Sequence, residues 1–336
     1  MTDKLYFGTY TKKTSEGIYS ADLDTKTGLL SNLALVAKES SPTYLTIDAD
    51  GHIYSVGAEN GQGGIAAFDN TGKLLNHVVE DGAPLCYVAV DEPRNLVYGA
   101  NYHKGEVIVY KRELDGSLTF SDKDTHTGHG PHANQTSPHV HFSDLTPDKY
   151  LITCDLGTDE VTSYDLTDDG KLKKIATYKS TAGAGPRHIV FHPTEKFAYL
   201  ICELNSTIEV LIYDGVGRFT LFQTISTLPE DFTDFNGTAA IRLSSDGHYL
   251  YGSNRGHDSI AVFEIAADGR LALIQIAPTN GLNPRDFNFS SDESLLIAAH
   301  QDSDNVTTFT RDKNTGLLSE IQHDFIVPEA VCVFVK

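Results

Sequence analysis

Short runs of β-branched and aromatic residues recur along the whole chain, and helical periodicity is absent. Residues of these types suit a pleated, half-buried surface, so each run predicts a β-strand. In the first run, Ile18 is followed three positions later by Ala21. In six later runs a β-branched residue is followed three positions later by an aromatic one, namely Ile65/Phe68, Val107/Tyr110, Val161/Tyr164, Val210/Tyr213, Ile260/Phe263 and Val306/Phe309.

Two further signals repeat in step with these strands. A glycine turn follows each of them, and successive turns stand 44 to 54 residues apart, at Gly28, Gly72, Gly116, Gly170, Gly217, Gly269 and Gly316. A proline opens an apolar strand in each unit, which a sheet tolerates because the first residue does not yet need its N–H. These prolines are Pro42, Pro84, Pro138, Pro186, Pro284 and Pro328, with Asn236 and Gly237 in the remaining slot.

Each unit therefore holds a proline-initiated strand, a return strand, the aromatic strand and the strand after the glycine turn. Seven four-stranded units of about 45 residues predict an all-β fold, a seven-bladed β-propeller. The segment from Lys4 onward lacks a proline strand, whereas residues 327–335 supply one alone. We expect N- and C-terminal strands to close the last blade, which removes an exposed edge, and residues 1–336 to form a single domain.

Composition narrows the class of protein. The chain has 336 residues, above the roughly 250–300 at which a single core usually stops growing, so growth by repetition is expected. The net charge of −20 argues against a nucleic-acid surface. Neither a signal segment nor a membrane-spanning apolar run is expected. The cysteines lie in apolar strands without CxxC pairs, which predicts reduced thiols, a cytoplasmic location and no zinc site: Cys86, Cys154, Cys202 and Cys332.

Charged residues cluster where the repeat predicts one mouth of the central channel. The residues after the prolines should be equivalent there, namely Thr43, Leu85, His139, Arg187, Thr238, Arg285 and Glu329. The ends of the return strands should add Asn101, Asp155, Glu203, Arg255 and His300. Converging arginines would bind the phosphate or carboxylate of a small anionic metabolite, because the guanidinium fork suits both. The alternative is a solvated rim held by structural ion pairs.

Arg187 and Glu203 form the central pair of this prediction. Arg187 begins a proline-initiated strand, and Glu203 ends the strand that returns from it. In an antiparallel pair the start of one strand lies beside the end of the next, so the two side chains should lie together.

A histidine-rich segment, residues 125–141, lengthens the local repeat to 54 residues. We expect it to fold over the channel mouth, with Asn134 and Gln135 offering hydrogen bonds to a ligand. Its five histidines match no standard metal-ligand spacing, so no metal is predicted. His141 is either a pocket residue or a satisfied core histidine, and His188 and His192 are predicted to be structural.

The motifs Ser137-Pro138-His139-Val140-His141, Gly185-Pro186-Arg187-His188, Cys202-Glu203 and Ser253-Asn254-Arg255-Gly256 together resemble the seven-bladed propeller lactonases. That family includes the propeller-type 6-phosphogluconolactonases and the fungal carboxy-muconate cyclase. The resemblance covers essentially the whole chain and implies catalytic roles for His139, Arg187, Glu203 and Arg255. Arg285 is added as a substrate-binding residue from its position after proline, with His141, Asn134, Gln135 and His300.

The resemblance implies a lactonase of the 6-phosphogluconolactonase type, which hydrolyses a phosphorylated or carboxylated lactone without a cofactor. Either Glu203 or His139 would be the general base, Arg187 would face the oxyanion, and Arg255 and Arg285 would hold the anion. A cycloisomerase acting on an unsaturated dicarboxylate is the alternative enzyme, since family membership does not fix the reaction. A non-catalytic binding propeller is the third hypothesis.

Overall fold

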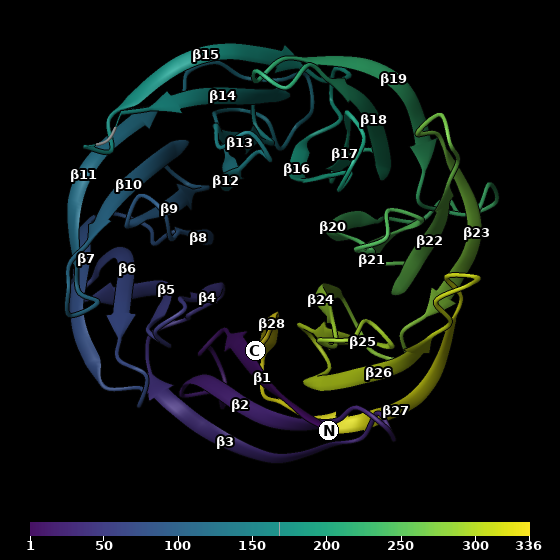
Figure 1. Ribbon diagram of the computed structural model, residues 1–336, viewed down its shortest axis with the longest axis horizontal. Coiled ribbons are helices and arrows are strands. Elements are labelled where there is room, and N and C mark those ends of the chain that lie inside the picture. Colours follow the sequence, from purple (N-terminus) through teal and green to yellow (C-terminus); the bar gives the residue numbers. More distant parts are fainter. Residues whose placement is uncertain (168) are drawn as a thin grey trace.

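The structure, a computed structural model, describes residues 1–167 and 169–336. Their strands form seven four-stranded antiparallel sheets arranged as a ring, so the predicted seven-bladed β-propeller is confirmed (Figure 1). No helix in these ranges is long and apolar enough to cross a membrane.

Each blade has the predicted four strands in sequence order. The first three blades after the N-terminus are β4 (Leu45–Ile47), β5 (Ile53–Glu59), β6 (Gln62–Phe68) and β7 (Leu74–Asp81); β8 (Tyr87–Asp91), β9 (Leu96–Asn101), β10 (Glu106–Arg112) and β11 (Leu118–Thr125); and β12 (Val140–Leu145), β13 (Leu151–Asp155), β14 (Glu160–Leu166) and β15 (Leu172–Lys179). The next three are β16 (Pro186–Phe191), β17 (Phe197–Cys202), β18 (Thr207–Tyr213) and β19 (Phe219–Ser226); β20 (Gly237–Leu243), β21 (Tyr249–Arg255), β22 (Ser259–Ile265) and β23 (Leu271–Pro278); and β24 (Pro284–Phe289), β25 (Leu295–His300), β26 (Asn305–Arg311) and β27 (Leu318–Ile326).

The seventh blade joins the two ends of the chain. Its sheet order is β28 (Ala330–Val335), β1 (Thr2–Thr9), β2 (Gly17–Asp24) and β3 (Leu30–Lys38), and β1 pairs with both β2 and β28. The predicted closure by both termini is therefore confirmed. It leaves no unpaired strand between the first and last blades, which an open ring would expose.

The inner strands surround the channel, and the core lies between neighbouring blades (Figure 1). Large side chains with no exposed surface fill these interfaces, among them Tyr54, Tyr98, Tyr199 and Tyr251. Side chains alternate between the two faces along the third strand of each blade, so each face packs into one of the two neighbouring interfaces. Both faces of these strands are therefore buried, and their sequences are nearly continuous apolar runs.

The aromatic position of the repeat lies beside a β-bulge. The pairing of the third strand with the outermost strand shifts immediately before Phe68, Tyr110, Tyr164, Phe263 and Phe309. In β18 the same shift precedes Leu211. The pair Val210/Tyr213 proposed from the sequence is thus two residues out of register. Tyr213 is the last residue of β18 and only resembles the aromatic position of the repeat. Ile208 and Leu211 occupy the positions that Val161 and Tyr164 have in β14.

Glu329, predicted at the channel mouth, instead clamps the N-terminal segment to the closing strand. Its carboxylate accepts hydrogen bonds of 2.9–3.2 Å from the backbone N–H groups of Lys12, Lys13, Thr14 and Ser15. Burial by itself would raise the pKa of Glu329, but these four donors lower it below the ordinary value.

Glu329→Gln is expected to destabilise the protein by about 2 kcal/mol at neutral pH, because it replaces charge-assisted hydrogen bonds by neutral ones. A carboxyl whose pKa is lowered by folding stabilises the protein above its unfolded pKa, near 4.5, and loses that contribution as pH falls through the folded value. Thermal unfolding of the wild type and variant at pH 7 and pH 3.5 measures this, and the difference should shrink at the lower pH. Glu195→Gln, on an exposed turn, is the control; an equal effect of both variants would contradict the clamp.

Candidate active site

Arg187 and Glu203 meet at the end of the channel where the first strand of each blade begins. Pro186 pairs with Cys202, which brings Glu203 directly beside the start of β16. The Glu203 N–H donates to the carbonyl of Gly185, at 2.8 Å, and Gly185 has a φ of 68°. Nε of Arg187 lies 2.9 Å from Oε2 of Glu203, so the juxtaposition predicted from the sequence is present.

β-bulges direct two of the site's arginines and one histidine. The pairing of the first and second strands skips Arg187 in β16, Arg285 in β24 and His141 in β12. A bulge inserts an unpaired residue and re-aims its side chain. His141, and not His139, is therefore the structural equivalent of Arg187. The prediction that the residue after each proline faces the channel mouth is wrong in this blade, because Val140, and not Pro138, occupies the position that Pro186 has in β16.

The return strands show a one-residue offset between the sequence repeat and the strand register. By register, Asn101, Asp155, Cys202 and Asn254 are equivalent, because each pairs with the first residue of the third strand. His300 is their counterpart in β25, because the preceding Ala299 pairs with the second residue of β26, Val306. Successive side chains of a strand point to opposite faces. The residue directly after each member of this set therefore points to the opposite face. These following residues include Tyr102, Glu203, Arg255 and Gln301, which explains why Glu203 and Arg255 meet whereas Asp155 and His300 point elsewhere.

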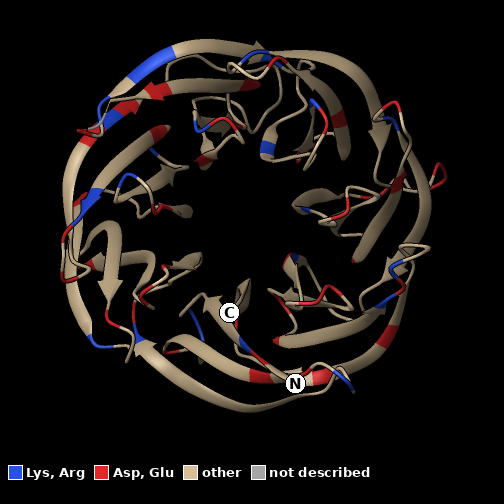
Figure 2. Ribbon diagram, viewed as in Figure 1, with Lys and Arg blue, Asp and Glu red and all other residues tan. Residues whose placement is uncertain are grey.

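Two guanidinium groups contact this single carboxylate, and that of Arg285 lies in the same cavity wall. Nη2 of Arg255 lies 2.9 Å from Oε2 of Glu203 and also near the carbonyl of Thr238, at 3.2 Å. Arg285 donates from Nη1 to Oε1 of Gln301, at 3.2 Å. A Cβ at Gly237 would lie 3.3 Å from Nη2 of Arg255, so glycine leaves room for the guanidinium in the one blade that lacks the proline. Basic segments of β16 and β24 flank the central opening, whereas most other charges lie farther out (Figure 2).

Glu203, Arg255 and Arg285 border a cavity of about 310 Å³ at the channel mouth, and Arg187 lines a small adjoining cavity together with His141 and Arg285. The walls of the larger cavity come from all seven blades, so no single blade forms the site. The lining residues are Tyr10, Ser41, Thr43, Pro84, Leu85, Cys86, Tyr102, His103, His141, Glu203, Arg255 and Arg285. Tyr10, Tyr102 and His103 were not predicted from the sequence; the register of the return strands would have indicated Tyr102, which occupies the place of Glu203 in the blade of β8–β11.

The site has an excess of positive charge. Burial by itself would raise the pKa of Glu203, but Arg255, Arg187 and Arg285 lower it below the ordinary value. Burial and the neighbouring charge of Arg255 lower the pKa of Arg187 to about 9, so it remains a cation at neutral pH. Its contact with Glu203 is an ion pair without a well-directed hydrogen bond, because the Nε–H is buried and has no acceptor in good geometry. The cavity can therefore bind an anion.

The residues 4–335 match the family described as "Lactonase, 7-bladed beta-propeller". The chain belongs to this family. The 6-phosphogluconolactonase of Bacillus subtilis is 44% identical over 338 residues, covering 98% of this chain and 97% of that protein. A crystal structure of a protein from Lactobacillus plantarum has 48% identity, a TM-score of 0.98 and 100% coverage of both chains. The periplasmic gluconolactonase of Pseudomonas aeruginosa has 29% identity and a TM-score of 0.93, with 100% and 99% coverage.

His139 contacts a residue of the cavity wall, Tyr102, and is held in one orientation. Its ring stacks on Tyr102, with centroids 4.2 Å apart and planes inclined by 10°. Its Nδ1 is 2.9 Å from the carbonyl oxygen of Tyr102. A carbonyl only accepts hydrogen bonds, so Nδ1 must carry the proton, and neutral His139 has its lone pair on Nε2. That tautomer is the one a general base requires.

The structure places three other predicted residues away from the cavity. Gln135 is fully buried, and its side chain is occupied by Leu156, Asp159 and the backbone of His132. Asn134 is exposed, and its N–H donates to Nδ1 of His132. His300 is buried, with Nδ1 2.9 Å from the carbonyl of Asn305. These positions offer no contact to a ligand in the cavity.

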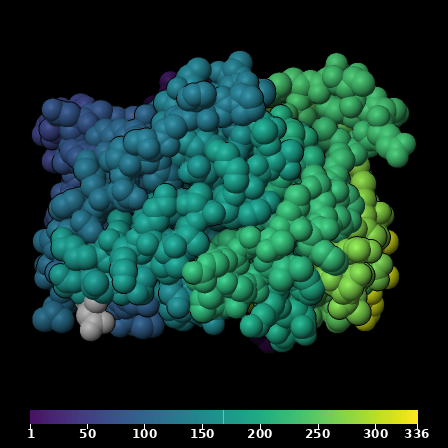
Figure 3. Space-filling model, turned by 90° about the horizontal axis from the view of Figure 1, so that it is seen from above, coloured from purple at the N-terminus to yellow at the C-terminus, as the bar shows by residue number. Residues whose placement is uncertain are grey.

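The histidine-rich segment rises from the same end of the ring but does not close the mouth. Figure 3 shows two lobes on that face, one coloured as the β11–β12 connection and one as the β19–β20 connection. His126 is paired with Asp155 through Nδ1, at 2.8 Å, and with the hydroxyl of Tyr164 through Nε2. Among the described residues that line the cavity, none comes from 126–137. The segment is anchored to the neighbouring turn by these contacts.

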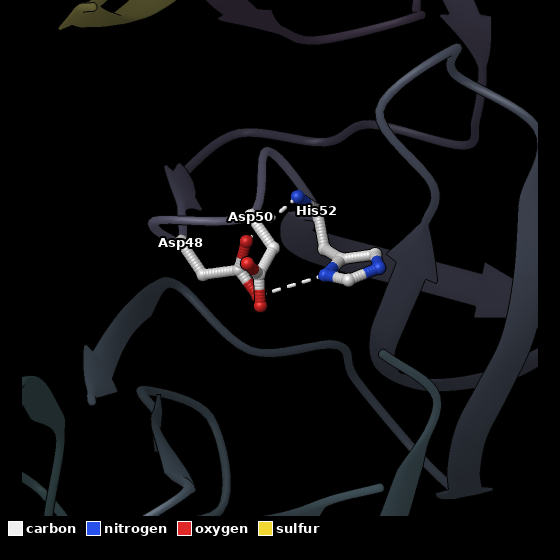
Figure 4. A group of neighbouring side chains, drawn as sticks. All are labelled: Asp48, Asp50 and His52. Carbon is white, nitrogen blue, oxygen red and sulfur yellow. Dashed lines mark hydrogen bonds and ion pairs between the residues drawn. The ribbon is translucent and has the colours of Figure 1, made fainter. Parts of the chain in front are cut away.

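One group of potential metal ligands lies at the other end of the ring, in the β4–β5 turn. Asp48, Asp50 and His52 bring their ligand atoms within 4.8 Å of one another (Figure 4). Oδ2 of Asp48 already contacts Nδ1 of His52, at 2.9 Å, and Nη1 of Arg112, at 2.8 Å. Arg112 supplies the compensating charge, so this group is a structural ion-pair network.

Proposed function

We propose that the protein is a hydrolase that opens a sugar lactone, with 6-phosphogluconolactone as the foremost candidate. The proposal is carried by Arg255 and Arg285 in the wall of a cavity of this size, with Arg187 paired to Glu203 and lining the small adjoining cavity. It matches a substrate with a polarised ester carbonyl and a separate anionic group. The activity named for the Bacillus subtilis relative supports the same substrate.

In this reaction water adds to the lactone carbonyl, and the ring C–O bond then breaks. Nε2 of His139 would take the proton from the attacking water and return it to the leaving ring oxygen. Arg187, whose Nε–H lacks a directed acceptor, would donate to the oxyanion of the tetrahedral intermediate. Glu203 would hold Arg187 and Arg255 in place. We assign the base to His139 because two arginines and a lowered pKa make Glu203 the weaker proton acceptor.

The direct test is a lactone-opening assay with 6-phosphogluconolactone generated in situ, corrected for spontaneous hydrolysis. The proposal expects an enzyme-dependent rate that is unchanged by a chelator, because no step uses a metal. Unphosphorylated gluconolactone and an unsaturated dicarboxylate of the muconate type complete the panel. Turnover of the dicarboxylate alone, or of none of the three, would overturn the proposal.

Arg285→Ala is expected to raise KM for 6-phosphogluconolactone by about tenfold or more and to leave kcat within a few-fold. The reason is that Arg285 is proposed to hold the phosphate in both the ground state and the transition state, so its removal weakens uniform binding. The KM for unphosphorylated gluconolactone should change little. Arg218→Ala, on an exposed turn far from the channel, is the control. An equal KM increase for both lactones would show that Arg285 does not contact the phosphate.

A further inference from the structure

Two buried histidines connect Arg187 to the cavity. Nη1 of Arg187 lies 3.4 Å from Nε2 of His188, and the same Nε2 lies 3.2 Å from Nδ1 of His141. His188 and His141 are 3% and 5% exposed. The rings of Tyr44 and Tyr87 pack edge-on against His188, which fixes the plane of its imidazole. His141 lines the cavity.

The contacts from Arg187 through His188 to His141 determine which ring nitrogen of each histidine carries the proton. A guanidinium can only donate, so Nε2 of His188 accepts and its proton is on Nδ1. His141 must then donate from Nδ1 to the same atom. Its own lone pair is left on Nε2, for which the described part of the chain offers no protein partner. Hydrogen-bond chemistry thus specifies one tautomer for each ring.

Both rings are held neutral as well. Burial lowers the pKa of His141 well below its ordinary value, and the charges of Arg187 and other arginines lower it further. Burial and Arg187 act on the pKa of His188 in the same direction. An imidazole that resists protonation at neutral pH is a poor proton carrier but a permanent hydrogen-bond acceptor.

We infer that His141 presents Nε2 as a fixed acceptor for a hydroxyl of the substrate, and that His188 is the positioning residue that imposes this tautomer. A polyhydroxylated lactone has such a donor, whereas the hydrocarbon frame of an unsaturated dicarboxylate has none. The pair therefore selects sugar lactones over carboxylated ones. The inference rests on the proposed function, since it names the substrate class of that same cavity.

The tautomers can be measured without any turnover. Long-range ¹H–¹⁵N correlation spectra at pH 7, assigned with single-histidine variants, distinguish protonated from unprotonated ring nitrogens. Both His141 and His188 are expected in the Nδ1–H form. His188→Leu removes the acceptor and should release His141 into a mixture of tautomers, whereas His188→Gln retains an acceptor oxygen and should preserve the Nδ1–H form. A proton on Nε2 of His141 in the wild type would overturn the inference.

Substrate selection is measured with 6-phosphogluconolactone and its 2-deoxy, 3-deoxy and 4-deoxy analogues. In the wild type, loss of the hydroxyl bound by His141 should lower kcat/KM by about tenfold or more, because a buried acceptor is left unpaired. In His141→Leu that discrimination should fall to near unity, and His188→Leu should reduce it more than His188→Gln. His323→Leu, on the exposed outer strand β27, is the control.

The outcomes separate the two proposals. If the wild type opens none of these lactones, the proposed function fails, and the spectra still decide the tautomer. If it opens them but tolerates every deoxy analogue equally, or discriminates equally well in His141→Leu, only the role of His141 fails.

Discussion

Arg187→Met is expected to lower kcat for 6-phosphogluconolactone by about 100- to 1000-fold, the usual effect of removing one oxyanion donor. Arg187 is 2% exposed, and it reaches the site through its ion pair with Glu203, a residue of the cavity wall. Its guanidinium gains most from the charge that develops in the transition state, so kcat should fall more than KM rises. Steady-state kinetics with the coupled assay gives both constants.

Arg242→Met is the matched control for Arg187→Met. Arg242 also belongs to an inner strand, but it borders the separate cavity next to Tyr44, Tyr87 and Asp144 and is paired with Asp286 at 3.0 Å. Thermal unfolding and circular dichroism should show that both variants keep the propeller. A loss of kcat in Arg242→Met as large as that in Arg187→Met would show that removing any buried channel arginine damages the site, which contradicts the specific role.

His139→Ala is expected to lower kcat by about 100- to 10,000-fold, the range for loss of a general base. Neutral His139 has its lone pair on Nε2, because Nδ1 donates its proton to the carbonyl of Tyr102, at 2.9 Å. Added imidazole should restore part of the activity, because it supplies the missing proton acceptor. Rate measurements with and without imidazole, corrected for spontaneous opening, test both statements.

Glu203→Gln distinguishes the two candidate bases. If His139 is the base, Glu203→Gln should lose activity through displaced arginines, because the amide no longer balances the charges of Arg187 and Arg255, and imidazole should restore activity only to His139→Ala. A variant His139→Ala with nearly full activity, together with an inactive Glu203→Gln that imidazole does not rescue, would assign the base to Glu203.

Two offsets between the sequence repeat and the strand register show what limits inference from the repeat alone. His139 follows a proline as Arg187 does, yet His141, two residues later, is the structural counterpart of Arg187, because the β-bulge in β12 falls directly after Val140. In the return strands the offset is one residue: Asp155 and His300 were grouped with Glu203, although the register makes them equivalent to Cys202. A slip of one residue moves a strand's side chains to the opposite face.

Long-range packing explains the residues that the sequence could not place. Gln135 and Glu329 both look like ligand-binding groups in an unusual loop or at a channel mouth. In the folded protein the amide of Gln135 donates to the Leu156 carbonyl and the Asp159 carboxylate, 21 and 24 residues away, and Glu329 accepts from backbone N–H groups more than 300 residues away. Nothing local to either residue specifies that partner. Tyr10 reaches the cavity only because the N-terminal strand is closed against the C-terminal one.

The sequence by itself determined the number of blades, their four-strand composition, the closure by both termini and the meeting of Arg187 with Glu203. Those features follow from turn residues, strand patterning and antiparallel pairing, which act over a few tens of residues. Only the tertiary structure decided which residue of each strand end faces the cavity, and which nitrogen of His139, His141 and His188 carries the proton. The β-bulges determine the side-chain directions, and the hydrogen-bond partners determine the histidine tautomers. These partners come from other blades or from backbone groups that the repeat pattern does not encode.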